Sequence, residues 1–149
     1  GVNFQFGHNL DTNATRVEKL SEEIGLRSCI VENVMYRGHA ISSSRIRHAV
    51  LEGRLGEAAE MIGRPYQVLA RRETSVIDEK AEFFLPEDDL LIPPEGQYEV
   101  FIKDNDTVHK TKVNVVHNYI ALSLRMRSDN IRLAFVDKAV QQKENVVWL

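Results

Sequence analysis

The segment with the clearest chemical potential is Ala40-Ile41-Ser42-Ser43-Ser44-Arg45-Ile46-Arg47. We expect its serines to start a helix, where their hydroxyl groups lie beside backbone N–H groups that have no partner within the helix. Arg45 and Arg47 add two guanidinium groups, two residues apart. This set of donors is typical of a site that binds a phosphate. The simpler alternative is that Ser42 only caps the helix and that the arginines are solvated.

Basic residues outnumber acidic residues around this segment. Residues 37–54 hold four arginines, two histidines and one carboxylate, namely Arg37, Arg45, Arg47, Arg54, His39, His48 and Glu52. The whole chain has the opposite balance, because its 149 residues include 19 basic and 22 acidic side chains, for a net charge of -3. We therefore expect residues 37–54 to attract an anionic ligand such as a polyphosphate.

The composition is typical of a soluble globular chain, since a hydrophobic content of 43% is enough to form the core of one domain or two small ones. The weak net charge argues against nucleic acid as a partner, and no apolar run reaches the roughly 18 residues of a membrane span. Cys29 is the single cysteine, which excludes an internal disulfide. We expect a cytoplasmic protein with small-molecule partners, and a homo-oligomer stays an open option. The first residue is Gly1, which we expect not to be the natural start.

The first part of the chain has the pattern of an α/β domain. Val2–Phe6 alternates as a strand does, Thr12 or Asn13 can cap a helix that ends near Gly25, and Ser28–Val31 is a short apolar run typical of a buried strand. This order predicts a βαβ unit with two parallel strands. Two further helices are expected, one from the serines at 42–44 to near Gly53 and one over residues 56–62.

Two parallel strands would leave long unpaired edges and too little apolar surface for independent stability. We therefore interpret residues 1–64 as the second half of a doubly wound, Rossmann-like domain. Its first strands would be cut away, disordered or supplied by another chain.

Residues 65–149 have an all-β pattern. The expected strands are Glu82–Leu85, Gln97–Ile102, Thr107–Val116, Tyr119–Met126 and Ile131–Val136. Hairpin turns are expected at residues 103–106, 117–118 and 128–130, so the strands should be mainly antiparallel and close into a small barrel. The apolar end Val146–Leu149 is expected to dock on another surface.

Three segments carry a resemblance to a known family: Gly1–Gly7, Ile41–Arg47 and Leu55–Tyr66. In this order they resemble the Gly-x-Asn/Asp-Phe-x-Phe-Gly segment, the Ile-Ser-Ser-Thr-x-Ile-Arg motif and the Leu-Gly-Arg-Pro-Tyr hinge of the bacterial bifunctional riboflavin kinase/FMN adenylyltransferases, the FAD synthetases. Ser44 stands where the family has threonine. Beyond residue 66 the resemblance is weak, with Pro94–Val100 alone similar to a Pro-x-Gly-Val-Tyr-x-Val strand of the family.

The resemblance implies transfer of AMP from ATP to FMN, which gives FAD and pyrophosphate with the help of magnesium. It also implies that Ser42, Ser43, Ser44 and Arg47 hold the phosphates of ATP. The nucleotide and flavin cleft would be lined by Asn3, Phe4, Phe6 and Gly7. For Phe4 and Phe6, plain core packing is the simpler interpretation.

Two motifs of the family are absent from these residues. The catalytic His-x-Gly-His does not occur, so no catalytic residue is assigned and the fragment alone is expected to be inactive. The Pro-Thr-Ala-Asn motif and the glutamate base of the kinase half are missing as well, which predicts a degenerate riboflavin-kinase-like barrel without kinase activity. The acidic run at residues 87–89 is interpreted as a solvated turn, and no metal site is assigned.

Three hypotheses follow from the sequence. The first is an FAD synthetase-like nucleotidyltransferase whose kinase half is inactive. The second is a non-catalytic module that binds nucleotide or flavin, or that dimerises. The third is a riboflavin kinase with a rearranged site.

Overall fold

The computed structural model describes residues 5–6, 12–76, 78, 80–87 and 90–136. It divides into two compact units, Gly1–Ile41 and Ser42–Leu149. The domain boundary predicted after residue 64 stays a prediction. Among the described residues, no helix has both the length and the apolar surface needed to span a membrane.

The described residues of the first unit form one helix and two short antiparallel ladders. Its elements are β1 (Gln5–Phe6), β2 (Thr12–Asn13), α1 (Ala14–Glu23), β3 (Met35–Tyr36) and β4 (His39–Ala40). The side chain of Asn13 accepts a hydrogen bond of 3.0 Å from the backbone N–H of Arg16, and Gly25 follows the helix with φ 73°. The helix and its cap at Asn13 are therefore confirmed.

The predicted βαβ unit is wrong in the described residues. Residues 28–31 belong to no strand, and β1 pairs with β2 in the antiparallel direction. The apolar run at 28–31 lacks a neighbour with which to form a ladder, and a strand exists only through such pairing. Residues 2–4 of the predicted first strand lie outside the described part. A Rossmann-like half is therefore not seen.

The residues of the first unit whose burial is described form no core. None of the side chains described in residues 13–41 is buried. Large apolar side chains are instead 59% to 71% exposed, namely those of Ile24, Leu26, Val31, Val34 and Met35. Such exposure is typical of a surface that another polypeptide covers.

The second unit begins with a helical hairpin, α2 (Ser43–Leu51) and α3 (Leu55–Ile62). Both helices follow the prediction. The two helices contact each other, and both carry buried side chains, among them Val50 on α2 and Ala58 on α3. Gly63, with φ 81°, ends α3 in the left-handed conformation that glycine adopts without strain.

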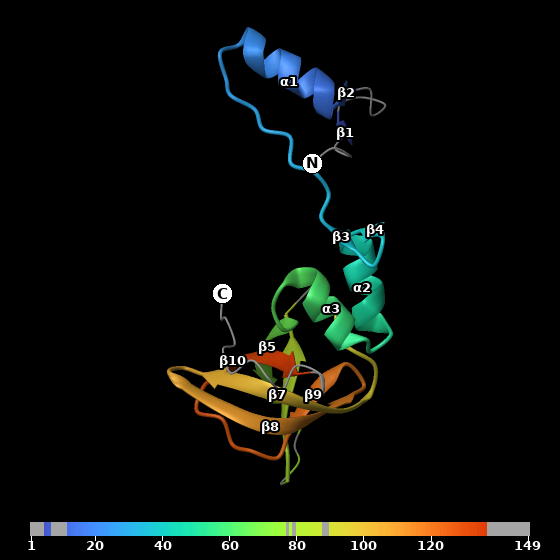
Figure 1. Cartoon of the computed structure of the whole chain (residues 1–149). Helices are drawn as coiled ribbons and strands as arrows, with labels where there is room; N and C mark the ends of the chain where they lie inside the picture. The colour runs from blue at the N-terminus through green and yellow to red at the C-terminus, as the bar shows by residue number, and fades with distance from the viewer. Residues whose placement is uncertain (1–4, 7–11, 77, 79, 88–89, 137–149) are drawn as a thin grey trace. The chain divides into compact units, whose positions relative to one another are not determined.

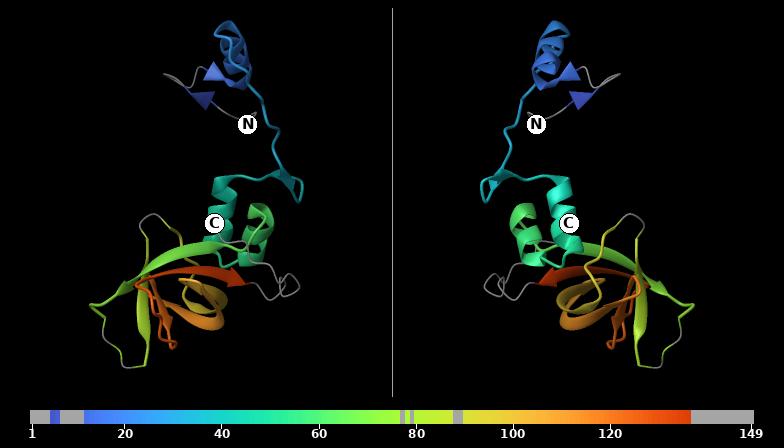
Figure 2. Two further views of the ribbon diagram at one scale, coloured as in Figure 1. Left: turned by 90° about the vertical axis from the view of Figure 1, so that its left-hand side faces the viewer. Right: turned by 90° about the vertical axis from the view of Figure 1, so that its right-hand side faces the viewer.

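The described residues that follow α3 form a closed barrel of six strands. They are β5 (Gln67–Glu73), β6 (Glu82–Pro86), β7 (Gly96–Asp104), β8 (Thr107–Val116), β9 (Tyr119–Leu122) and β10 (Asn130–Val136). Every pair is antiparallel, and the order around the barrel is β10-β5-β6-β9-β8-β7. Figures 1 and 2 show α2 and α3 on one side of this barrel, where α3 contacts β10. The predicted small antiparallel barrel is confirmed.

Large apolar side chains fill the barrel, and the largest that are fully buried are Phe84, Phe135, Ile102, Ile120, Leu122, Ile131 and Leu133. The turn between β8 and β9 places both His117 (φ 46°) and Asn118 (φ 68°) in the left-handed region. This geometry matches the twist of the two strands and confirms a hairpin at this position.

Three details of the barrel differ from the prediction. The strand β5 was not predicted, because Arg71-Arg72-Glu73 hides its alternating pattern. The strand predicted to reach Met126 ends at Leu122. Residues 128–130 do not form a hairpin turn, because β10 pairs with β5 and β7 and not with β9.

Candidate functional site

The start of α2 is built by Ser42. Its backbone is extended, with φ -144° and ψ 157°, and its hydroxyl oxygen accepts a hydrogen bond of 3.3 Å from the N–H of Arg45. Its carbonyl oxygen accepts the N–H of Ile46 at 3.1 Å. Ser42 is therefore the N-cap of the helix, as the simpler interpretation holds. Its O–H proton can still be donated to a ligand, because capping uses the oxygen only as an acceptor.

Ser43 and Ser44 occupy the first two positions of α2, and both side chains are exposed. Backbone N–H groups at these positions have no acceptor within the helix, because the preceding turn is missing. No acidic side chain lies in the first turn. The start of α2 thus presents hydroxyl and N–H donors at the positive end of a helix dipole.

Arg47 lies one turn further along and is exposed, whereas Arg45 is half-buried. No ion pair within the described part of the chain involves Arg47. Its guanidinium group can therefore donate to a ligand without first losing a carboxylate. The donor set of Ser43, Ser44 and Arg47 fits the oxygen atoms of a phosphate.

Near the opposite end of α2, the basic side chains are paired with carboxylates. His48 Nε2 lies 3.0 Å from Glu52 Oε1, and Arg54 Nε donates to Glu52 Oε2 at 2.8 Å. Arg54 also pairs with Glu57. The hydrogen bond from Arg54 lowers the pKa of the Glu52 carboxyl. Arg54, counted among the basic residues near the serines, is thus engaged by two carboxylates.

The first-unit residues assigned to a cleft are only partly described. Asn3, Phe4 and Gly7 lie outside the described residues. Phe6 is the last residue of β1, opposite Thr12 of β2. Their predicted role in a nucleotide and flavin cleft stays a prediction. Within the described ranges no three His, Cys, Asp or Glu side chains gather closely enough to hold a metal ion.

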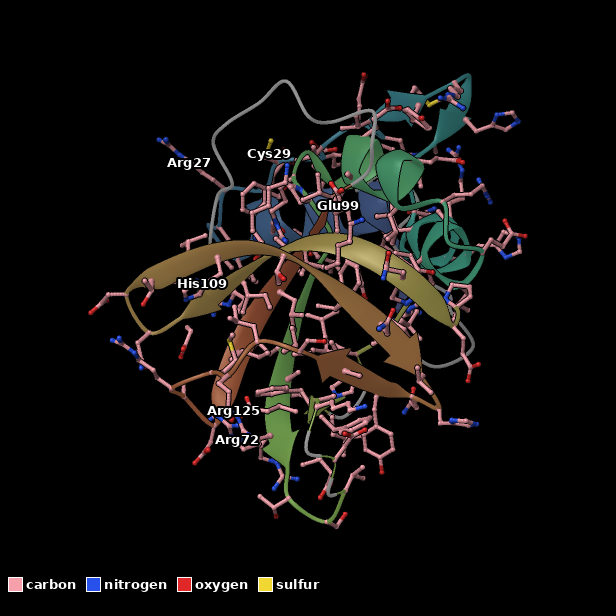
Figure 3. The ribbon with its side chains drawn as sticks, turned by 90° about the horizontal axis from the view of Figure 1, so that it is seen from below. Arg27, Cys29, Arg72, Glu99, His109 and Arg125 are labelled. Atoms are coloured by element: carbon pink, nitrogen blue, oxygen red, sulfur yellow. The ribbon has the colours of Figure 1, made fainter. Side chains whose placement is uncertain are left out.

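A polar cluster that the sequence did not reveal lies at one end of the barrel. Arg72 Nη1 lies 2.7 Å from Glu82 Oε1, and its Nε donates to Asp129 Oδ1 at 3.0 Å. Glu82 Oε2 accepts the N–H of Met126 at 2.9 Å. Arg125 is the other arginine near Glu82 Oε1, at 3.7 Å, and Figure 3 labels both arginines.

Asp104 completes this cluster although its side chain is 2% exposed. Its two carboxylate oxygens accept the N–H groups of Arg127 at 2.7 Å and of Ser128 at 2.9 Å. Charged side chains from β5, β6 and β7 therefore hold the connection between β9 and β10 in one conformation. The partners lie up to 57 residues apart in sequence, so no local pattern indicates the cluster.

The recesses in the surface of the second unit include two that described residues line. One of about 310 Å³ lies beside the α2–α3 turn, and its lining includes Gly53, Leu55, Gln97, Glu99 and Lys112. The other, of about 380 Å³, lies over β5, β6 and β10 and is lined by Arg71, Leu85, Pro86, Glu87 and Asn130.

The chain is similar to known proteins over part of its length. No family model matches the chain. "FAD synthetase 2, chloroplastic" of Arabidopsis thaliana is 27% identical over 110 residues, which cover 64% of this chain and 30% of that protein. "FAD synthetase 1, chloroplastic" of the same plant is 26% identical over 113 residues, which cover 64% of this chain and 32% of that protein.

The chain is similar to FAD synthetases. The similarity confirms the resemblance seen in the motifs, and the six-stranded barrel fits a riboflavin-kinase-like module. The chain spans about a third of the length of these FAD synthetases.

A solved structure shares the fold over most of the chain. It is titled a macrolide-efflux protein from Streptococcus pneumoniae, and it superposes with a TM-score of 0.72 at 20% identity. The match covers 91% of this chain and 48% of that one. At this identity the likeness shows the fold alone.

Proposed function

We propose that this chain is part of an FAD synthetase that transfers AMP from ATP to FMN. The observation that carries the proposal is the open start of α2, with Ser43, Ser44 and Arg47 exposed, in a chain similar to FAD synthetases. In this proposal residues 1–64 belong to the nucleotidyltransferase part. Residues 65–149 form a riboflavin-kinase-like barrel that has lost its own activity.

The reaction balances without a further reactant. A phosphate oxygen of FMN attacks the α-phosphorus of ATP, a new P–O bond forms, and the bond to the β-phosphate breaks. Pyrophosphate leaves with the electron pair of that bond, so negative charge grows on its oxygens. Donors that are already in place stabilise this charge at no cost of reorganisation, and Ser42, Ser43, Ser44 and Arg47 would supply them.

The acceptor side of the site is assigned by resemblance alone. Asn3, Phe4, Phe6 and Gly7 would line the cleft for nucleotide and flavin. Magnesium would accompany the phosphates of ATP, as is usual for nucleotide substrates. Within the described residues, no three His, Cys, Asp or Glu side chains lie close enough together to hold it.

Loss of the kinase activity is proposed from the chemistry of the barrel. A kinase of this kind needs a base near the riboflavin hydroxyl group. The strand expected to carry it is β9, and its sequence Tyr-Ile-Ala-Leu contains no carboxylate.

The proposal is tested by product formation. The full-length protein that contains these residues should convert ATP and FMN into FAD in the presence of magnesium, and residues 1–149 alone should form none. Chromatography of the flavins measures both. The proposal fails if the full-length protein forms no FAD and calorimetry shows that it binds neither ATP nor FMN.

A second candidate is a non-catalytic module that binds flavin or nucleotide, or that dimerises. It is favoured by the absence of the kinase motifs from these residues and by the apolar end Val146–Leu149. Light scattering on the chain trimmed after Asn145 tests the dimer, and an unchanged mass would rule out a role of the apolar end. The third candidate, a riboflavin kinase with a rearranged site, requires FMN to appear from riboflavin and ATP.

A further inference from the structure

The outer face of three adjacent barrel strands collects basic side chains. Val100 and Ile102 of β7 and Val113 of β8 are buried in the barrel, so the residues next to them along each strand face outward. The strand register places the outward residues in rows across β8, β7 and β10: Lys112–Glu99–Val136, Lys110–Phe101–Ala134 and Val108–Lys103–Arg132, of which Ala134 is buried. We call Lys103, Lys110, Lys112 and Arg132, with Phe101 between them, the basic face.

Among the described residues, the basic face has four cations and one acid. Lys103 and Arg132 lie directly opposite each other on neighbouring strands, an arrangement in which like charges destabilise a sheet. Lys110 Nζ lies 5.9 Å above the centre of the Phe101 ring. The acid of this face is Glu99, opposite Lys112 and labelled in Figure 3.

The ion pairs of the described part of the chain lie elsewhere. They use His48, Arg54, Arg72 and Arg125, and none uses a cation of the basic face. A chain with a net charge of -3 thus concentrates unpaired positive charge on one face of its barrel. Like charges that lie side by side, with no salt bridge to them in the described part of the chain, favour a function in which this face binds an anion.

The spacing of the cations fits an extended peptide. Lys110 and Lys112 are two residues apart on one strand, which separates their Cα atoms by about 7 Å. Alternate side chains of an extended peptide repeat at the same distance, so acidic residues at every second position would match both lysines. The recess of about 310 Å³ beside Lys112 and Gln97 offers space for one further side chain.

We propose that the basic face binds an extended acidic segment of a partner protein. Single-stranded nucleic acid is the less suitable anion, because it needs exposed aromatic rings on which bases stack. Phe101 is half-buried and is covered by Lys110, and the described rows of this face contain no second aromatic ring. The inference does not depend on nucleotide chemistry at α2.

The test is fluorescence anisotropy with the whole chain and a labelled peptide of alternating Glu and Thr. Binding should saturate and should weaken as salt is added, since the attraction is between exposed charges. The Lys110→Gln/Lys112→Gln variant should bind roughly tenfold more weakly or worse. The matched control is Arg16→Gln/Lys19→Gln, which removes two exposed cations from α1 and should leave the affinity unchanged.

Three outcomes would overturn the proposal. The first is equal binding of a peptide in which Gln replaces Glu. The second is an equal loss of affinity in both double variants. The third is stronger binding of oligo-dT or of anionic vesicles than of the acidic peptide. The NMR spectra of the variants and of the original chain should differ only at amides of Gly96–Asp104 and Thr107–Val116. Such a result would show that the variants are folded and would exclude unfolding as the cause of a loss of affinity.

Discussion

Ser42 and Ser43 are neighbours with the same side chain, but the structure gives them different roles. Ser42 Oγ accepts the N–H of Arg45, whereas Ser43 is exposed in the first turn of α2. Ser42→Ala should lower the free energy of unfolding by about 1 kcal/mol, because a helix loses its cap. Ser43→Ala should lower it by much less. Urea unfolding compares the two variants, and equal losses would contradict the assignment of Ser42 as the cap.

Asp104 is the buried acid whose removal should disturb the barrel most. Asp104→Ala would leave the N–H groups of Arg127 and Ser128 without their acceptors, so we expect a loss of about 2–3 kcal/mol in the free energy of unfolding. Asp106→Ala, at an exposed turn, is the control and should change it by less than about 0.5 kcal/mol. Hydrogen exchange should become faster at the amides of Arg127 and Ser128. Unchanged exchange there would show that Asp104 does not hold the connection.

Tyr66 joins the helix α3 to the barrel. Its hydroxyl group donates to the carbonyl oxygen of Leu91 at 2.7 Å, and its ring centre lies 6.5 Å from that of Phe135. Burial raises the pKa of Tyr66 above its ordinary value. The folded chain therefore keeps this proton to a higher pH than the unfolded chain does.

This difference makes stability depend on pH in the alkaline range. The contribution of Tyr66 is complete below the ordinary tyrosine pKa of about 10 and is lost as the pH rises through the higher pKa of the folded chain. Tyr66→Phe should remove that part of the pH dependence and, at neutral pH, lower the free energy of unfolding by about 1 kcal/mol. Urea unfolding at a series of pH values measures both. A variant with the same alkaline slope as the original chain would contradict the burial argument.

Elements that depend on local chemistry could be predicted from the sequence. The cap at Asn13, the end of α3 at Gly63 and the hairpin at residues 117–118 each follow from the conformations that a few neighbouring residues prefer. Elements that depend on a distant partner could not be predicted from the sequence. Residues 28–31 have the pattern of a strand but pair with no other strand in the described residues. The strand β9 ends at Leu122, where the connection to β10 begins that Glu82 and Asp104 hold in place.

The features of the candidate site that depend on local sequence could likewise be predicted, and those that depend on side-chain geometry could not. The start of a helix at the serines is a local property, and the structure places it where the sequence indicated. The engagement of Arg54 by Glu52 and Glu57 and the cluster around Arg72 depend on side-chain geometry that spacing does not reveal.

For the whole molecule, the two units should differ in stability. The buried apolar side chains of the described residues begin at Ala49, and those described in residues 13–41 are not buried. Because burial supplies most of the folding free energy, residues 42–149 should fold alone and melt within about 2 °C of the whole chain. Residues 1–41 alone should give the circular dichroism spectrum of an unfolded peptide. A large fall in melting temperature on removal of residues 1–41 would contradict this division.

In the proposed function, the start of α2 holds the phosphates of ATP. Titration calorimetry of ATP into the full-length protein tests it, with Arg47→Ala as the variant and Arg71→Ala, an exposed arginine on β5, as the control. We expect Arg47→Ala to weaken ATP binding by about 1–3 kcal/mol, which is about a fivefold to 150-fold rise in Kd, and Arg71→Ala to leave it unchanged. An unchanged Kd in Arg47→Ala would contradict the claim.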